Sequence, residues 1–308
     1  MRIGRTAVLS DTGRRRVNNE DSYVLELPLF AIADGVGGAQ AGEVASRLAA
    51  AALSERPPDA HGEDTLVTLI GEANRRIYER ALGDPEVAGM GTTITALLVD
   101  EAAGTIAIGH VGDSRAYLFR AGELRQLTDD HSLVGELVRS GRLSPENAEQ
   151  HPHRSVITRA VGTEASVEVD VETIQPEPGD LYILCSDGLT DMVPDAPIAR
   201  VVADARAEPE AVARELVAAA NRAGGIDNIT VVAFEIEDGD PPARTAATVA
   251  AEPDEPTAEA VDITTPEEAT VASVRRHGAG SGGRALALAA IVIALVAGAL
   301  LIWWGIAR

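Results

Sequence analysis

The sequence has little cysteine and a deficit of positive charge. Its 308 residues include one cysteine, Cys185, so no disulfide can form within the chain, as is usual in a reducing compartment. The formal net charge of -22 opposes binding to the phosphates of nucleic acids, so we expect no nucleic-acid partner. The first residues lack the apolar core of a signal peptide, and we expect the main domain to stay in the compartment where it is made.

A long hydrophobic run is present only near the other end of the sequence. Residues 285–304 contain no charged side chain, and a helix of this length can cross a bilayer core of about 30 Å. Trp303 and Trp304 would lie at an interface, and Arg284 directly precedes the run. We expect a single-pass transmembrane helix at the cell membrane, with the N-terminal domain cytoplasmic and residues 305–308 as a short extracytoplasmic tail. A buried core helix is the alternative.

The rest of the chain divides into a linker and a folded domain. Residues 238–284 are acidic and rich in Pro, Thr and Ala without a hydrophobic period, which is typical of a solvated linker. Residues 1–237 alternate short apolar runs with longer amphipathic segments. The predicted strands span residues 22–27, 29–34, 92–100, 105–113, 114–120, 167–174, 180–187 and 228–236. The predicted helices span residues 42–55, 63–82, 197–206 and 208–223.

The connections between the predicted strands indicate how the strands pair. Several neighbouring strands are joined too closely for crossover helices, so antiparallel pairing dominates. Two helix pairs and many strands favour sheets that pack face to face with helices outside, which is an α+β layered sandwich.

Aspartates mark the ends of several predicted strands. Asp34, Asp113 and Asp187 each follow an apolar run, and Asp227 directly precedes one. Carboxylates on rigid strand ends are suited to hard divalent cations such as Mg²⁺ or Mn²⁺. Gly35, after the first of them, lets its own carbonyl approach a cation. One such aspartate alone is more often a turn or helix cap, but four together favour a metal site.

Two divalent ions can hold a bridging water and aim it at phosphorus, which also requires a group that binds phosphate. Arg16 offers a planar guanidinium that suits two phosphate oxygens. Glu20 and Asp21 follow closely and could orient Arg16 or hold metal-bound water. The adjacent Arg14 and Arg15 remain unassigned, as part of a solvated surface.

Eight strings then occur in order between about residues 5 and 236. They are RVNNED, ADGVGG, GMGTTITALLV, GHVGDSRAYLF, LTDDHSLV, HPHRSVITRAVG, ILCSDGLTD and DNITVVAFEI. Together they resemble the metal-dependent PPM/PP2C family of serine/threonine protein phosphatases in its bacterial form. The resemblance implies a four-layer α-β-β-α sandwich of two antiparallel sheets flanked by helix pairs, and a centre of two Mn²⁺ or Mg²⁺ ions with the possibility of a third.

The resemblance also implies roles for single residues. Asp34 matches the carboxylate that bridges both metals, and Gly35 matches the residue whose carbonyl binds the second. Asp187 and Asp227 match ligands of the first metal. The remaining assignments are Glu20 to the second metal through water, Arg16 to the phosphate, and Asp113 to a third, weaker ion. The segment from Thr128 to Thr158 resembles the mobile flap beside the site, from which Ser155 would contact the third ion.

One departure from the family pattern concerns the general acid. Many eukaryotic members carry a histidine where this chain has Val36, which cannot donate a proton. Metal-bound water is the first candidate for protonating the leaving group. His131 and His153 of the flap are the second, since histidine titrates in the useful range.

Other hydrolytic mechanisms fit the sequence poorly. A cysteine-dependent phosphatase needs an arginine six positions after its thiolate, but Asp191 stands six after Cys185. Cys185 is therefore read as a buried apolar residue of a strand. Ser114 lacks the nucleophile elbow of serine hydrolases, and the sequence HPH lacks the helical zinc-peptidase pattern.

The sequence as a whole predicts a protein-serine/threonine phosphatase at the cytoplasmic face of the membrane. It would hydrolyse phosphoserine and phosphothreonine on proteins by a water that bridges two Mn²⁺ or Mg²⁺ ions. A tethered domain has a raised effective concentration toward membrane neighbours, so membrane-anchored serine/threonine kinases and their substrates are plausible partners. The alternatives are a non-catalytic, phosphatase-like membrane scaffold and a phosphatase of a small phosphorylated metabolite.

Overall fold

Two antiparallel sheets form the centre of the molecule in the computed structural model, which describes residues 1–37, 41–57, 59–148, 151–205 and 208–239. The strand order of the first sheet is β1-β11-β10-β7-β8, with β1 Arg2–Asp11, β11 Ile229–Glu237, β10 Leu181–Cys185, β7 Arg115–Arg120 and β8 Glu123–Gln126. The order of the second is β2-β3-β5-β6-β9, with β2 Asp21–Glu26, β3 Leu29–Val36, β5 Ile94–Asp100, β6 Thr105–Val111 and β9 Asp170–Ile174. The short β4 (Gly91–Thr92) also pairs with β3.

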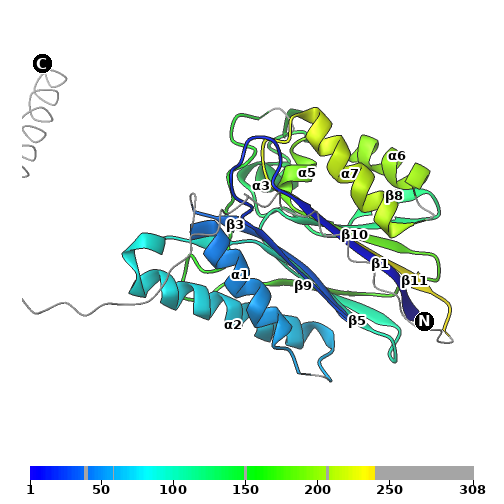
Figure 1. Ribbon diagram of the computed structural model, residues 1–308, viewed down its shortest axis with the longest axis horizontal. Coiled ribbons are helices and arrows are strands. Elements are labelled where there is room, and N and C mark those ends of the chain that lie inside the picture. Colours follow the sequence, from blue (N-terminus) through cyan, green and yellow to red (C-terminus); the bar gives the residue numbers. More distant parts are fainter. Residues whose placement is uncertain (38–40, 58, 149–150, 206–207, 240–308) are drawn as a thin grey trace, which may run out of the picture. The chain divides into compact units, whose positions relative to one another are not determined.

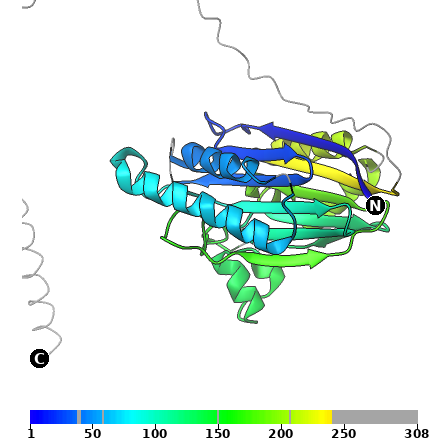
Figure 2. The same ribbon diagram turned by 90° about the horizontal axis from the view of Figure 1, so that it is seen from below.

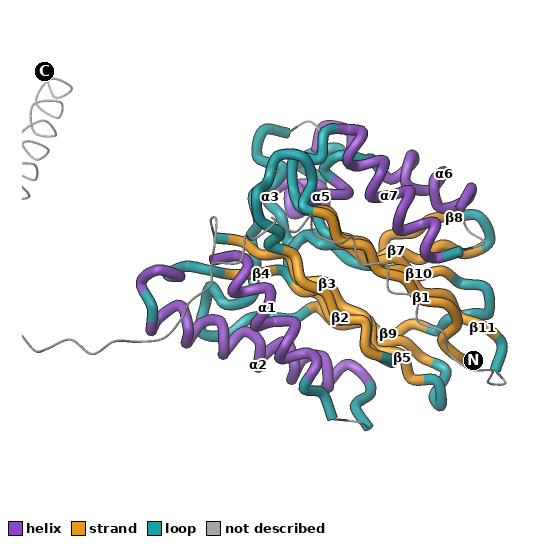
Figure 3. The backbone as a smooth tube through the Cα atoms, viewed as in Figure 1, coloured by secondary structure: helices purple, strands orange, loops and turns teal. Residues whose placement is uncertain are grey.

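Helix pairs cover the outer faces of the two sheets (Figures 1 and 2). The helices α1 (Ala41–Ser54) and α2 (Gly62–Gly83) pack on the second sheet. The helices α6 (Asp195–Ala205) and α7 (Pro209–Ala223) pack on the first. Shorter helical segments lie in the connections: η1 Pro85–Val87, α3 Leu133–Arg139, α4 Pro145–Ala148 and α5 Asp187–Thr190. The tube in Figure 3 shows the two layers of strands between the two pairs of long helices.

The central strands are apolar on both faces because each lies between a helix layer and another sheet. In β3, Leu29 and Ala31 belong to the core beneath α1 and α2, whereas Phe30 and Ile32 face the other sheet. Side chains alternate along a strand, so one uninterrupted apolar run serves both cores. Phe234 of β11 stacks on Phe30 across the two sheets, with 3.9 Å between ring centroids.

The predicted α+β sandwich of two antiparallel sheets with outer helices is confirmed. Each predicted strand and helix is present within a few residues of its expected bounds. The sequence reading did not identify β1, which pairs with β11 along most of its length. Gly4 and Arg5 interrupt its apolar pattern, and the pairing register shifts between Ile3 and Thr6.

The predicted membrane anchor concerns a part of the chain that the structure does not describe. Among the described residues, no helix has the length and apolar character needed to span a bilayer. The predicted span at residues 285–304, the tail at 305–308 and most of the predicted linker lie outside the described residues. The domain boundaries therefore remain predictions.

Replacing Phe30 with alanine should lower the free energy of unfolding by about 3–5 kcal/mol, because it leaves a cavity opposite Phe234 between the two sheets. Urea denaturation followed by circular dichroism measures this change. Tyr23→Ala on the neighbouring strand is the control, since that side chain is 37% exposed, and it should cost about 1 kcal/mol or less. Equal losses in both variants would contradict this account of the core.

Candidate metal centre

Aspartates from both sheets gather at one end of the sandwich. Asp34 lies near the end of β3, directly opposite Asp21 on β2 in the strand register. Asp187 begins α5 just after β10, and Asp227 precedes β11. Desolvation raises the pKa of Asp34 well above its usual value, and the neighbouring charges of Asp187, Asp21, Asp113 and Asp227 raise it further. The four aspartates predicted from sequence are therefore close enough to interact, and Asp21 joins them.

Two of these carboxylates have a buried oxygen that accepts no hydrogen bond from the part of the chain that the structure describes. Oδ2 of Asp21 accepts hydrogen bonds from Ser186 Oγ at 2.8 Å and from Thr230 Oγ1 at 2.6 Å. Its Oδ1, like Oδ1 of Asp113, is buried without a hydrogen-bond partner among the described residues. Buried polar atoms are almost always paired, so unpaired carboxylate oxygens indicate a place for a cation. Burial raises the pKa of Asp21 to about 6 and that of Asp113 to about 7.

The acids do not form a closed ligand cage by themselves. Within the described ranges, no three Asp, Glu, His or Cys side chains converge as a ready-made metal site. Like charges held near each other repel, and the ligand set expected from the sequence includes a backbone carbonyl and water besides carboxylates. The donor chemistry, all oxygen and strongly anionic, fits Mn²⁺ or Mg²⁺.

Two threonines, Thr92 at the end of β4 and Thr93 between β4 and β5, hold Asp34 in place. Its backbone N–H donates to Thr93 Oγ1 at 3.0 Å, and its carbonyl accepts from Thr92 Oγ1 and from the N–H of Thr93, both at 2.8 Å. Thr93 Oγ1 also bonds Ser114 Oγ at 2.8 Å. The two threonines stand in one of the motifs that carry the family resemblance, but the sequence alone gave them no role.

Close backbone packing explains the glycine after Asp34. A Cβ atom added to Gly35 would lie 2.3 Å from the carbonyl oxygen of Gly42 in α1 and 2.7 Å from that of Glu20. A Cβ on Gly42 would in turn lie 2.6 Å from Oε2 of Glu20. Only glycine fits at either position. The end of β3 and the start of α1 therefore pack directly against each other and against Glu20, the residue expected to bind a metal through water.

Arg16 is held beside the acids by an ion pair. Its Nη2 lies 2.7 Å from Oδ2 of Asp227, and 46% of its side chain is exposed.

Asn228 fixes the loop that carries Arg16. Its amide donates to the carbonyls of Thr12 and Asn18 and accepts from the N–H of Glu20. Asn228 was missed as a functional residue because its partners are backbone atoms more than two hundred positions away.

The flap residues predicted from sequence have defined partners. Ser155 Oγ donates to Oδ2 of Asp191 at 3.0 Å, so its hydroxyl is engaged by the segment that follows Asp187. Burial lowers the pKa of His131, and its ring nitrogens contact Gly112 and Asp170, which leaves neither for a substrate. His153 is exposed on the flap.

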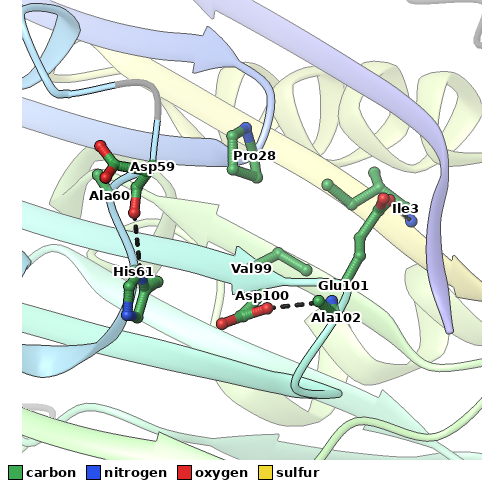
Figure 4. Close-up of a pocket in the computed structure, with 9 residues that line it drawn as sticks. All are labelled: Ile3, Pro28, Asp59, Ala60, His61, Val99, Asp100, Glu101 and Ala102. Atoms are coloured by element: carbon green, nitrogen blue, oxygen red, sulfur yellow. Dashed lines mark hydrogen bonds between the residues drawn. The ribbon is translucent and has the colours of Figure 1, made fainter.

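A cavity of about 470 Å³ adjoins the acidic cluster. Its lining is rich in aspartates, which include the predicted ligands Asp113 and Asp187, and also contains arginines and apolar side chains. Val134, Val138 and Arg139 come from α3. The cavity in Figure 4, of about 370 Å³, lies beyond the opposite end of β3 and contains none of the predicted site residues. The candidate site is therefore at the end of the sandwich where Asp34 and Asp187 meet.

The raised pKa values in the acidic cluster lead us to expect that Mn²⁺ stabilises the protein more at neutral pH than at acidic pH. Carboxyls whose pKa is raised by folding bind more protons in the folded state between about pH 4 and 7, so their contribution to the free energy of unfolding falls as pH rises. A cation replaces those protons. The rise in melting temperature on exchanging EDTA for Mn²⁺ should be larger at pH 7.5 than at pH 5, and smaller in Asp34→Asn. An equal rise at both pH values and in the variant would contradict this.

Comparison with known proteins agrees with this geometry. The family model described as "Protein phosphatase 2C" matches residues 14–219. The serine/threonine protein phosphatase PstP of Mycobacterium tuberculosis is 44% identical over 241 residues, which cover 77% of this chain and 46% of that protein. The chain thus spans about half the length of this relative. The serine/threonine phosphatase stp of Listeria innocua is 40% identical over 238 residues, covering 73% of this chain and 93% of its own.

Solved structures give the same result. The crystal structure of the PstP catalytic domain in complex with two manganese ions superposes with a TM-score of 0.70 at 40% identity. The match covers 77% of this chain and 99% of that one. On the family model, the identity to its relatives and the shared fold, this chain belongs to the protein phosphatase 2C family.

Proposed function

We propose that the chain hydrolyses phosphoserine and phosphothreonine monoesters on proteins, with a water that bridges two Mn²⁺ or Mg²⁺ ions as the attacking group. The observation that carries the proposal is the meeting of aspartates from both sheets at one end of the sandwich, where buried carboxylate oxygens have no partner among the described residues. Membership of a phosphatase family and a manganese-bound relative support it.

The ligands expected from the sequence have places in this mechanism. Asp34, Asp187, Asp227 and the carbonyl of Gly35 would hold the two ions, and Glu20 would act through water. When bound, the ions supply a nucleophilic water at neutral pH and neutralise charge on the phosphoryl group. The protein supplies the fixed positions, since the acids stand on strand ends whose backbones are tied by hydrogen bonds.

Arg16 would bind the phosphate. Its pairing with Asp227 turns the guanidinium toward the acidic cluster, and its partly exposed position keeps it accessible to a substrate. Asp113 would bind a third, weaker ion, and Ser155, whose hydroxyl donates to Asp191 in this structure, would contact the same ion. Val36 follows Gly35 at the end of β3 and, without a proton to donate, takes no part in acid catalysis.

The cavity beside the cluster favours a polypeptide substrate over a small metabolite. Its 470 Å³ exceed what a phosphate group needs, and apolar residues such as Val134 and Met192 line it together with Arg139 and Arg154. A peptide chain offers apolar and charged side chains to such a surface, whereas a small phosphorylated metabolite leaves most of it unused. The relatives are named as serine/threonine phosphatases, which supports the same choice.

The full chain should release phosphate from a phosphothreonine peptide only when Mn²⁺ or Mg²⁺ is present. Asp34→Asn should reduce kcat/KM by at least about 100-fold, since metal activation is worth several kcal/mol and about 1.4 kcal/mol corresponds to a factor of ten. Asp59→Asn, an exposed acid in the other cavity, is the matched control and should keep wild-type activity. No phosphate release by the wild type under any metal condition would favour the scaffold alternative. Faster hydrolysis of small phosphate esters than of peptides would favour a metabolite phosphatase.

We also propose that residues 285–304 anchor the protein in the cell membrane, with the phosphatase domain in the cytoplasm. The uncharged run of 20 residues and the arginine before it support this placement. A tether of this kind would bring the domain close to membrane-anchored serine/threonine kinases and their substrates, which are the partners we propose.

Removal of residues 285–308 should move the protein from the membrane fraction to the soluble fraction while leaving its phosphatase activity unchanged. Ultracentrifugation of cell lysates followed by immunoblotting measures the distribution. A truncation of the same length within the linker, which keeps the apolar run, controls for the loss of chain. An unchanged distribution would refute a spanning anchor.

A further inference from the structure

His131 lies near the start of the flap and contacts both the last residue of the flap and the residue that follows β6. Its side chain is 3% exposed. Its backbone N–H donates to the carbonyl of Gly112 at 2.7 Å, and its own carbonyl accepts from the N–H of Thr158 at 2.7 Å. His131, three residues after the start of the flap, thus joins the last residue of the flap to the turn that precedes Asp113.

The contacts of the imidazole ring fix its tautomer. The backbone N–H of Gly112 donates to Nδ1 at 3.0 Å, so Nδ1 carries no proton. In the neutral ring Nε2 therefore carries the proton and donates to Oδ2 of Asp170 at 3.0 Å. Nη1 of Arg159 lies 3.1 Å from the same nitrogen, but because arginine only donates, it forms no hydrogen bond to a protonated Nε2. Arg159 pairs with the other oxygen of Asp170. The Nε2 side of the ring is therefore held by Asp170, which is itself paired with Arg159, and the Nδ1 side binds Gly112.

Gly112 has a backbone conformation that needs such support. Its φ is +113°, and a Cβ atom there would lie 2.5 Å from Cγ2 of Thr93, so the position requires glycine. Glycine has no preference of its own for this conformation over many others. His131 bonds both the N–H and the carbonyl of Gly112, and the next residue is Asp113, whose buried Oδ1 has no partner among the described residues.

We propose that His131 is a positioning residue that fixes Gly112 and thereby aims the carboxylate of Asp113 at the weaker metal ion. In the histidine, Asp170 keeps the proton on Nε2 and so leaves Nδ1 free to accept from Gly112. The proposal rests on the proposed function for the identity of the ion at Asp113, but not for the geometry. In this proposal His131 positions the metal ligand Asp113, whereas the sequence suggested His131 as a candidate general acid.

Two variants separate the two halves of the ring. In His131→Asn the side-chain amide reaches the place of Nδ1, so it can still accept from Gly112 but cannot reach Asp170. In His131→Gln the amide reaches the place of Nε2 and can still donate to Asp170, but it offers no acceptor to Gly112. Asp113→Ala serves as the reference without the weaker site, and thermal unfolding confirms that each variant folds.

Mn²⁺ binding to the full chain, measured by electron paramagnetic resonance of free Mn²⁺ without substrate, tests the proposal. The Kd of the weaker site should rise about tenfold in His131→Gln, the lower end of the effect of losing an outer-sphere partner, and the tighter sites should not change. His131→Asn should stay within about twofold of wild type.

Equal Mn²⁺ binding by the Gln and Asn variants would overturn the proposal, as would a weakening of all sites together or a wild type without a weaker site. A lack of phosphatase activity in a wild type that still shows this contrast would refute the proposed function and leave the positioning role intact.

Discussion

The repulsion between carboxylates held on rigid strand ends is the constraint on which the rest of this structure depends. Asp34 and Asp21 belong to one sheet, and Asp187 and Asp227 border strands of the other, so the cluster exists only when the two sheets are stacked. Bringing these charges out of water and close to one another opposes folding. The apolar core between the sheets, with Phe30 on Phe234, offsets that cost, and a divalent cation would remove much of it.

Much of the fold could be predicted because the central strands have apolar residues on both faces. A run such as that of β3 is buried on one side by helices and on the other by a sheet, and its sequence shows this directly. The aspartates were equally visible, because each follows or precedes such a run. In contrast, β1 contains Gly4 and Arg5 and a shift in register, so no local pattern marks it.

What the sequence could not provide was the set of contacts that position the site. Asn228 bonds backbone atoms of the N-terminal loop, which every residue type possesses. Thr93 bonds Asp34 and Ser114, which are distant from it in the sequence. The identity of a side chain indicates that it can form hydrogen bonds, but only the fold decides with which atoms. His131 is the clearest case. The usual titration range of histidine suggested a general acid, whereas the burial and the hydrogen-bond partners of His131 favour a role in positioning Gly112.

The pairing of β1 with β11 joins the first and last strands of the described domain. During synthesis the N-terminal strand therefore waits for a partner that leaves the ribosome more than two hundred residues later, next to Asp227. Contacts between such distant segments form late and slowly. A ribosome-bound nascent chain would carry most of the acidic residues but no complete centre, so competence for metal binding would arise in one step, when the final strand closes the sheet.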